Sequence, residues 1–159
     1  MNRPLRSLEA RAIGLLARRD YSRAELRTRL AEHASDADAL EATLDKLASK
    51  KLLSDERFVG SLVRRKAERF GLARIRHELQ AHQLAPEQLE PALSALKASE
   101  FDRALQVWRK RFGEAPATHE ARARQMRFLA GRGFAAEVIR RVIGQAKAPP
   151  SDPAEPDPF

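Results

Sequence analysis

The sequence has no cysteine, few aromatic residues and no long apolar run, and each absence excludes a class of protein. Without cysteine, the chain can form neither disulfides nor thiolate metal sites, which suits a reducing cytosol. No apolar stretch has the length of a signal peptide or of a membrane-spanning helix. Leu, Ala, Arg and Glu dominate instead, and β-branched residues are scarce. Because these are helix formers, we expect a soluble, cytoplasmic, all-α protein.

The groups that mark enzymes are also missing. The seven glycines are scattered, and "GRGF" at 131–134 lacks both the Lys-Ser/Thr pair and the preceding strand of a phosphate-binding loop. Its glycines are expected to end one helix and turn into the next. No serine, threonine or lysine stands in a setting that marks an activated nucleophile. Four histidines lie far apart and are interpreted as solvated or capping rather than metal-binding: His33, His77, His82 and His119. We expect no catalytic residue, no metal and no cofactor, and a protein that is not an enzyme.

The net charge of +8 is unevenly distributed along the chain. Residues 1–59 carry 12 Lys/Arg against 10 Asp/Glu, whereas residues 60–147 carry 18 against 9. The last twelve residues hold three acids, no base and five of the nine prolines, so this tail is expected to be disordered. The basic part of the chain is expected to face a polyanion or an acidic protein surface.

The helical pattern repeats with a constant spacing. Between residues 19–30 and 68–79, an offset of 49 places Tyr21 on Phe70, Ser22 on Gly71, Leu26 on Ile75 and Leu30 on Leu79. The same offset carries three leucines of the next helix onto Leu89, Leu93 and Leu96. A looser third copy follows at an offset of 50. A unit of this size buries little apolar surface alone. Stacking such units extends one hydrophobic core through the array.

We therefore predict an elongated tandem array of three three-helix repeats. The expected bounds are 1–54, 55–99 and 100–147, followed by the proline-rich acidic tail at 148–159. Within the first repeat, Ser22 and Glu25 form the S-x-x-E pattern of a capping box. Eight residues are expected to be structural core: Tyr21, Leu26, Leu30, Phe58, Phe70, Ile75, Leu79 and Phe128.

Clusters of basic residues follow the first repeat and are not balanced by acids. Any single cluster can be a solvated helix face, but a face of one sign repels itself unless a negative partner relieves it. Trp108, Phe112 and Phe128 lie beside these clusters and are either stacking platforms for bases or core residues. Ten residues are our candidates for contact with a partner or with DNA: Arg64, Arg65, Arg69, Arg74, Arg76, Arg109, Lys110, Arg124, Arg127 and Arg132.

These motifs resemble those of the RecX family of regulatory proteins. The first repeat matches "LARR-x-YS-x-x-EL-x-x-x-L" over Leu16–Leu30, and the second matches "D-x-RF" at Asp55–Phe58 and "G-x-x-x-I-x-x-EL" at Gly71–Leu79. The third matches "KRFG" and "RQMRFLAGRGF", the latter over Arg124–Phe134. The resemblance covers about residues 7–146. It departs from the family at Val59, where alanine is usual, and the tail has no counterpart that we can name.

The resemblance implies a regulator of the RecA recombinase that acts in recombination, DNA repair and the SOS response. Proteins of this kind lie in the groove of the RecA filament on single-stranded DNA, span neighbouring protomers, and inhibit ATP hydrolysis, strand exchange and filament growth. We expect a monomer that binds the RecA filament, contacts single-stranded DNA as part of that filament, and binds no membrane. The alternative is a stand-alone nucleic-acid-binding helical module, because small three-helix units can carry helix-turn-helix geometry.

Overall fold

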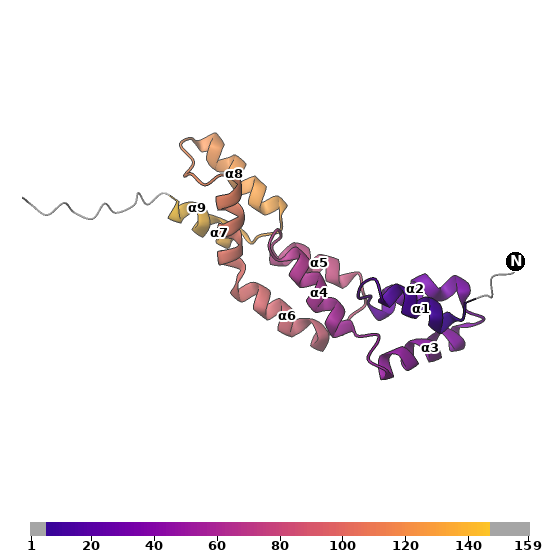
Figure 1. Ribbon diagram of the computed structural model, residues 1–159. Coiled ribbons are helices and arrows are strands. Elements are labelled where there is room, and N and C mark those ends of the chain that lie inside the picture. The colour runs from indigo at the N-terminus through magenta and orange to yellow at the C-terminus, as the bar shows by residue number, and fades with distance from the viewer. Residues whose placement is uncertain (1–5, 147–159) are drawn as a thin grey trace, which may run out of the picture. The chain divides into compact units, whose positions relative to one another are not determined.

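The structure is a computed structural model that describes residues 6–146, and all regular secondary structure in this part of the chain is helical (Figure 1). The predicted all-α class is therefore confirmed, whereas the predicted disordered tail lies outside the described residues. The helices are α1 (Leu8–Leu16), α2 (Arg23–Leu30), the short 3-10 helix η1 (Ala31–His33), α3 (Ala37–Ser49), α4 (Asp55–Lys66), α5 (Leu72–Gln80), α6 (Pro86–Ala98), α7 (Glu100–Arg111), α8 (His119–Gly131) and α9 (Ala136–Gln145).

Packing groups the described residues into two compact units. The first unit contains residues 6–65 and 77–93, and the second contains residues 66–76 and 94–146. The middle repeat therefore contributes to both units. Most of α4 belongs to the first, whereas the turn between α4 and α5 belongs to the second.

Side-chain caps begin the helices of the first unit where the sequence indicates. The Ser22 hydroxyl accepts a hydrogen bond from the Glu25 backbone N–H at 3.1 Å, and Asp36 accepts from the Ala39 N–H at 2.7 Å. The other half of the predicted capping box is not seen among the described residues. The Glu25 carboxylate instead accepts from the Arg19 guanidinium, because an ion pair with a nearby cation outcompetes a single backbone N–H.

The first unit packs α1, α2 and α3 around leucines. Leu26, Leu30, Leu44 and Leu47 are at most 1% exposed, so this apolar cluster supplies the core that the periodicity predicts. Residues of the middle repeat add polar contacts to the same unit. His82 lies 2.8 Å from the Ser22 hydroxyl through Nδ1, and its ring packs on Phe58.

The second unit packs α7 against both α8 and α9. Its core includes Trp108, Leu129 and Ile143. The Trp108 indole is 5% exposed and donates to the buried Gln125 side chain at 2.8 Å. Trp108 is therefore a core residue, because a buried ring whose N–H already has a partner is not available for stacking on a base.

Of the eight predicted core residues, one is less buried than the other seven. Seven are at most 8% exposed, and Phe128 is only partly buried. Phe128 lies beside the second-unit core and meets the Phe112 ring edge-on, with 5.3 Å between centroids. The three leucines that the repeat pattern places on α6 differ in burial. Leu96 is buried, whereas Leu89 and Leu93 are only partly buried.

Candidate functional site

The ten predicted contact residues lie at the surface, in both units. Nine are exposed, and Arg132 is partly buried. Arg64 and Arg65 belong to the first unit and the other eight to the second. Within residues 6–146, no carboxylate lies within 4 Å of the charged groups of these ten side chains. These residues therefore present positive charge that the protein itself does not neutralise.

Three of the ten converge on one aromatic ring in the second unit. The guanidinium of Arg74 lies 4.1 Å from the centroid of Phe70, that of Arg69 lies 5.3 Å away and that of Arg132 lies 5.7 Å away. Lys66 contributes its ammonium at 5.5 Å. We call these four cations and Phe70 the Phe70 cluster. Each cation is within the range of a cation–π contact, which is worth about 0.5–1 kcal/mol at exposed sites.

A second pair of rings continues the Phe70 cluster. The Arg132 guanidinium also lies 4.7 Å from the centroid of Phe128. Arg111 lies 5.5 Å from Phe112 and 6.0 Å from Phe128. Aromatic faces thus hold these guanidiniums in place, and a ring occupies the face of a guanidinium without using its N–H edge. That edge stays available at Arg74 for the paired hydrogen bonds that a carboxylate or phosphate accepts, whereas one Nη of Arg132 already donates to the Arg69 carbonyl at 3.3 Å.

Close contact between two turns brings Arg132 to Phe70. The Gly71 N–H donates to the Arg132 carbonyl at 2.8 Å, and the Ala73 N–H donates to the Gly133 carbonyl at 3.3 Å. A Cβ on Gly71 would overlap the Gly133 carbonyl group, and a Cβ on Gly133 would lie 2.6 Å from that of Arg74. Gly133 also has a φ of +86°, a conformation that favours glycine. Both glycines are required for this approach.

Glu100, in the first turn of α7, stabilises the same contact between the two turns. Glu100 is 4% exposed, and its Oε1 accepts from the N–H groups of Leu72 and Ala135, each at 3.2 Å. One carboxylate therefore caps the N-termini of both α5 and α9, where a negative charge also complements the helix dipoles. It replaces the cap that Ser22 supplies in the first repeat, since Gly71 has no side chain.

Arg103, one turn further along α7, binds the opposite kind of helix end. Its guanidinium donates to the carbonyls of Ala67, Phe70 and Leu96 at 3.0, 2.6 and 2.9 Å. These carbonyls follow α4 or belong to the last turn of α6, where free acceptors and the negative dipole end favour a cation. Burial lowers the pKa of Arg103 from its ordinary value, and Glu100 partly opposes that shift.

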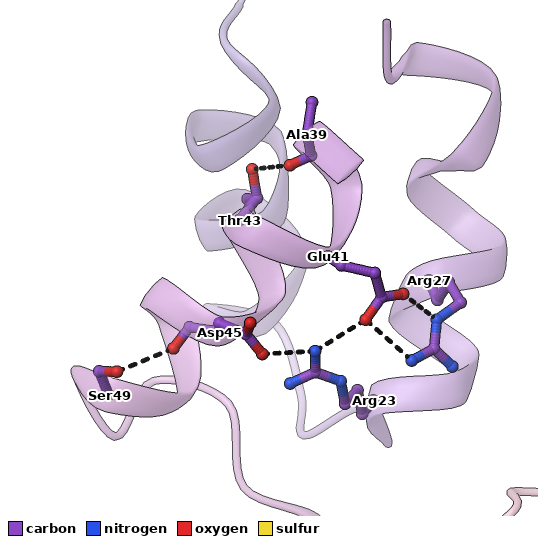
Figure 2. A network of polar contacts seen from close by, with 7 residues as sticks. All are labelled: Arg23, Arg27, Ala39, Glu41, Thr43, Asp45 and Ser49. Atoms are coloured by element: carbon purple, nitrogen blue, oxygen red, sulfur yellow. Dashed lines mark hydrogen bonds and ion pairs between the residues drawn. The ribbon is translucent and has the colours of Figure 1, made fainter. Parts of the chain in front are cut away.

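In the first unit, several arginines form ion pairs with carboxylates. Figure 2 shows Arg23 bridging Glu41 and Asp45 at 2.8 and 2.6 Å, while Arg27 also binds Glu41. The hydrogen bonds from Arg27 and Arg23 lower the pKa of Glu41 from 4.5 to about 2. Bonds from Lys46 and Lys50 lower that of Glu9 to about 2 in the same way. These cations are neutralised within the protein, in contrast to Arg69, Arg74 and Arg132 of the Phe70 cluster, which form no ion pair with a carboxylate among the described residues.

The contrast holds at equivalent positions of the repeat. In the first repeat, the Arg19 guanidinium lies 3.7 Å from the centroid of Tyr21 and is paired with Glu25. The offset of 49 places Phe70 on Tyr21 and Arg74 on Glu25. The second repeat keeps the aromatic ring, but it has Glu68 at the position of Arg19 and arginines, Arg69 and Arg74, at the positions of Asp20 and Glu25. The sign of the charge is therefore reversed at these positions, and among the described residues Arg69 and Arg74 form no ion pair with a carboxylate.

The remaining predicted residues are not brought into the Phe70 cluster. Arg64 donates to the Ser61 hydroxyl at 3.2 Å on α4, and Arg65 lies beside it in the chain. Arg76 lies exposed on α5, and Arg109 lies in the last turn of α7. Lys110 lines a hollow of about 340 Å³ with Glu68 and Asp102. Arg124 and Arg127 line another of about 490 Å³ at the start of α8.

Four residues of this region were not among the sequence candidates. Lys66 and Arg111 belong to basic runs, but no pattern in the sequence says which member of a run reaches a ring. Glu100 and Arg103 carry only the signal of an acid and a base at the start of a helix, which is common. Their partners lie 28 to 36 residues away in most cases, so local spacing could not reveal their role.

Comparison with known proteins identifies the family. Sequence models of the first, second and third three-helix domains of RecX match residues 10–47, 54–93 and 98–143, in that order. The chain belongs to the RecX family. These matches confirm the resemblance and the tandem order of three three-helix domains, while the exact bounds predicted for each repeat stay a prediction.

Curated relatives cover nearly the whole chain. Regulatory protein RecX of Leptothrix cholodnii is 49% identical over 142 residues, which are 89% of this chain and 90% of that protein. Regulatory protein RecX of Ralstonia nicotianae is 47% identical over 150 residues, or 94% of each chain. Membership in RecX therefore supports a regulatory role with a protein partner, and agrees with the expectation that the chain is not an enzyme.

Solved structures show the same fold. The crystal structure of RecX from Lactobacillus salivarius superposes with a TM-score of 0.74 at 17% identity, and covers 87% of this chain and 94% of that one.

Between residues 6 and 146, no helix is both long and apolar enough to cross a membrane, and no group of three or more histidines and acids could hold a metal ion.

Proposed function

We propose that this RecX-family protein binds RecA-type recombinase filaments on single-stranded DNA and inhibits their ATP hydrolysis, strand exchange and growth. In this way it modulates recombination and DNA repair in the cytoplasm. The family membership supports the regulatory role. The observation that carries the proposal is the Phe70 cluster, whose arginines have no carboxylate partner among residues 6–146.

The Phe70 cluster has the properties of a protein-binding surface. Arginines and aromatic rings dominate the binding energy of many protein interfaces. Here Arg74 and Arg132 lie on the rings of Phe70 and Phe128, so little side-chain freedom is lost when they bind. A matching surface on the recombinase would carry carboxylates that accept from the free guanidinium edges. Its negative charge would also steer association.

Tandem repeats suit a partner that is itself periodic. A filament presents the same surface on each protomer, and a chain of three like-built domains can contact more than one of them. Each further contact then forms at a high effective concentration, so several weak contacts add up to strong binding. Bound between protomers, the protein would oppose the subunit movements that accompany ATP hydrolysis and the addition of new subunits.

The test is inhibition of DNA-dependent ATP hydrolysis by a purified RecA recombinase, compared between wild type and Arg74→Glu. Arg74→Glu places an acid at the centre of the Phe70 cluster, so we expect at least a tenfold rise in the concentration that inhibits by half, equivalent to about 1.4 kcal/mol. The matched control is Arg140→Glu on α9, which changes the charge equally at an exposed arginine outside the candidate set. It should inhibit as wild type does.

Three outcomes would contradict the proposal. The first is that wild type leaves ATP hydrolysis unchanged at several-fold excess over filament sites. The second is that Arg74→Glu and Arg140→Glu weaken inhibition equally, which would mean that only net charge matters. The third is that affinity for DNA is the same with and without recombinase, which would favour the alternative of a stand-alone nucleic-acid-binding module.

A further inference from the structure

A second basic site lies on the first repeat. A hollow of about 390 Å³ opens there, lined by four arginines from the residues before α1, from α1 and its end, and from α2: Arg6, Arg11, Arg18 and Arg29. We call it the first-repeat hollow. The only acid that lines it is Glu32, whose carboxylate lies 3.6 Å from the His33 imidazole. The hollow therefore has a strong excess of positive charge.

The nearly balanced charge of the first repeat conceals this excess. Several acids of the unit pair with other bases: Glu9 with Lys46 and Lys50, Glu25 with Arg19, and Asp20 with Arg57. Arg23 and Arg27 are held by Glu41 and Asp45. Among the described residues, no carboxylate comes within 4 Å of the four arginines of the hollow. The cations of this unit that form ion pairs are therefore different residues from the four arginines that line the hollow.

One glycine lies in the lining of the hollow. Gly14 lies inside α1, where glycine is less favourable for a helix than alanine. A Cβ built on Gly14 would meet no other atom within 4 Å, so packing within the protein does not require glycine here. The lining of the hollow between Arg11 and Arg18 therefore has room for a side chain at this position.

We propose that the first-repeat hollow binds the phosphodiester backbone of a nucleic acid. Protein interfaces that use arginines also have aromatic or other apolar anchors, yet no Phe, Tyr or Trp lines this hollow, and its apolar side chains are only Leu15, which is partly buried, and Leu30, which is buried. Interfaces with nucleic acids are polar and strongly positive, and arginine contacts to phosphate position the strand without reading its sequence. Because this site needs no recombinase, it goes beyond the proposed function.

The test measures binding of the full chain to a fluorescent single-stranded oligonucleotide, by anisotropy at several salt concentrations and without recombinase. The variant Arg11→Gln, Arg29→Gln removes two charges from the hollow. If each arginine contacts a phosphate, affinity should fall roughly 10- to 30-fold near ~0.1 M salt, and the salt slope should fall by about 0.7 per lost contact. The matched control, Lys46→Gln, Lys50→Gln, removes two charges that Glu9 already neutralises. It should bind within twofold of wild type.

A second pair of variants tests the hollow itself. Gly14→Glu adds a carboxylate where a side chain meets no steric obstacle, and we expect it to weaken oligonucleotide binding about tenfold, whereas Gly14→Ala should not. Circular dichroism confirms that each variant folds. Equal weakening by the arginine and lysine pairs would overturn the proposal. So would an arginine pair that loses affinity for polyglutamate but not for the oligonucleotide, because the hollow would then serve an acidic protein. No measurable oligonucleotide binding by wild type would also overturn it.

Discussion

Two residues on one turn of α7 hold the helix ends of the second unit. Glu100 accepts from the first N–H groups of α5 and α9, and Arg103 donates to the carbonyl ends of α4 and α6. Both side chains are nearly or partly buried, so losing either leaves backbone groups without partners in a poorly hydrated place. Such losses cost more than the net value of the hydrogen bonds themselves.

At the residue scale, we predict that Arg103→Met lowers the free energy of unfolding by about 2–4 kcal/mol, because three carbonyls lose a charged donor. Urea denaturation followed by Trp108 fluorescence measures it, since Trp108 is the single tryptophan and lies in the second unit. The control Arg109→Met, at an exposed position of the same helix, should change stability by less than about 0.5 kcal/mol. Equal stability of the two variants would show that the three carbonyl contacts contribute nothing.

At the element scale, the turns that carry Gly71 and Gly133 determine where the arginines lie. The N–H groups of Gly71 and Ala73 can donate to the carbonyls of Arg132 and Gly133 because neither glycine has a side chain at the contact. This backbone contact brings the end of α8 to the start of α5, and with it Arg132 to Phe70. The geometry of the Phe70 cluster is therefore a property of the turns as much as of the arginines.

We predict opposite effects of alanine at two glycines. Gly71→Ala should destabilise the second unit by roughly 1–3 kcal/mol, because its methyl group overlaps the Gly133 carbonyl and forces the turns apart. Gly14→Ala should stabilise the first unit by about 0.5–1 kcal/mol, because the helix interior gains a better helix former. Thermal unfolding by circular dichroism compares them. A stabilising Gly71→Ala would contradict the backbone contact.

Much of the fold, but less of the site, could be predicted from the sequence. Periodic leucines and the Ser22 cap predicted the helices of the first repeat because those signals are local. The equivalence of Gly71 with Ser22 correctly predicted that a helix begins there. That Glu100 supplies the missing cap, or that Arg132 reaches Phe70, depends on contacts across 28 to 63 residues. Phe128 is less buried than predicted because hydrophobic periodicity does not report how many neighbours cover a helix face.

At the scale of the whole molecule, the two units differ in how they use charge. The ion pairs of Glu9, Asp20, Glu25 and Glu41 lie in the first unit, and the pKa of each of these carboxyls is lowered by its basic or hydroxyl partners. The free arginines of the Phe70 cluster lie in the second. Ion pairs therefore neutralise many of the charges of the first unit, whereas the arginines of the Phe70 cluster are left without carboxylate partners among the described residues.

This difference predicts an acid response. A carboxyl whose pKa is lower in the folded state stabilises the fold above its unfolded pKa, near 4.5 for Glu41, and that contribution is lost as the pH falls towards its folded value of about 2. Between these values the first unit should lose stability, so helicity should fall before Trp108 fluorescence changes. Glu41→Gln, which cannot titrate, should reduce this acid-dependent loss. Coincident helicity and fluorescence transitions in wild type would contradict the assignment.

The shared carboxylate of Glu100 has a consequence for cooperativity. Because the same oxygen serves the starts of α5 and α9, neither helix can fray at that end without disturbing the hydrogen bond of the other. Loss of the hydrogen bond at the start of α9 would therefore also disturb the start of α5, which follows the turn that carries Phe70.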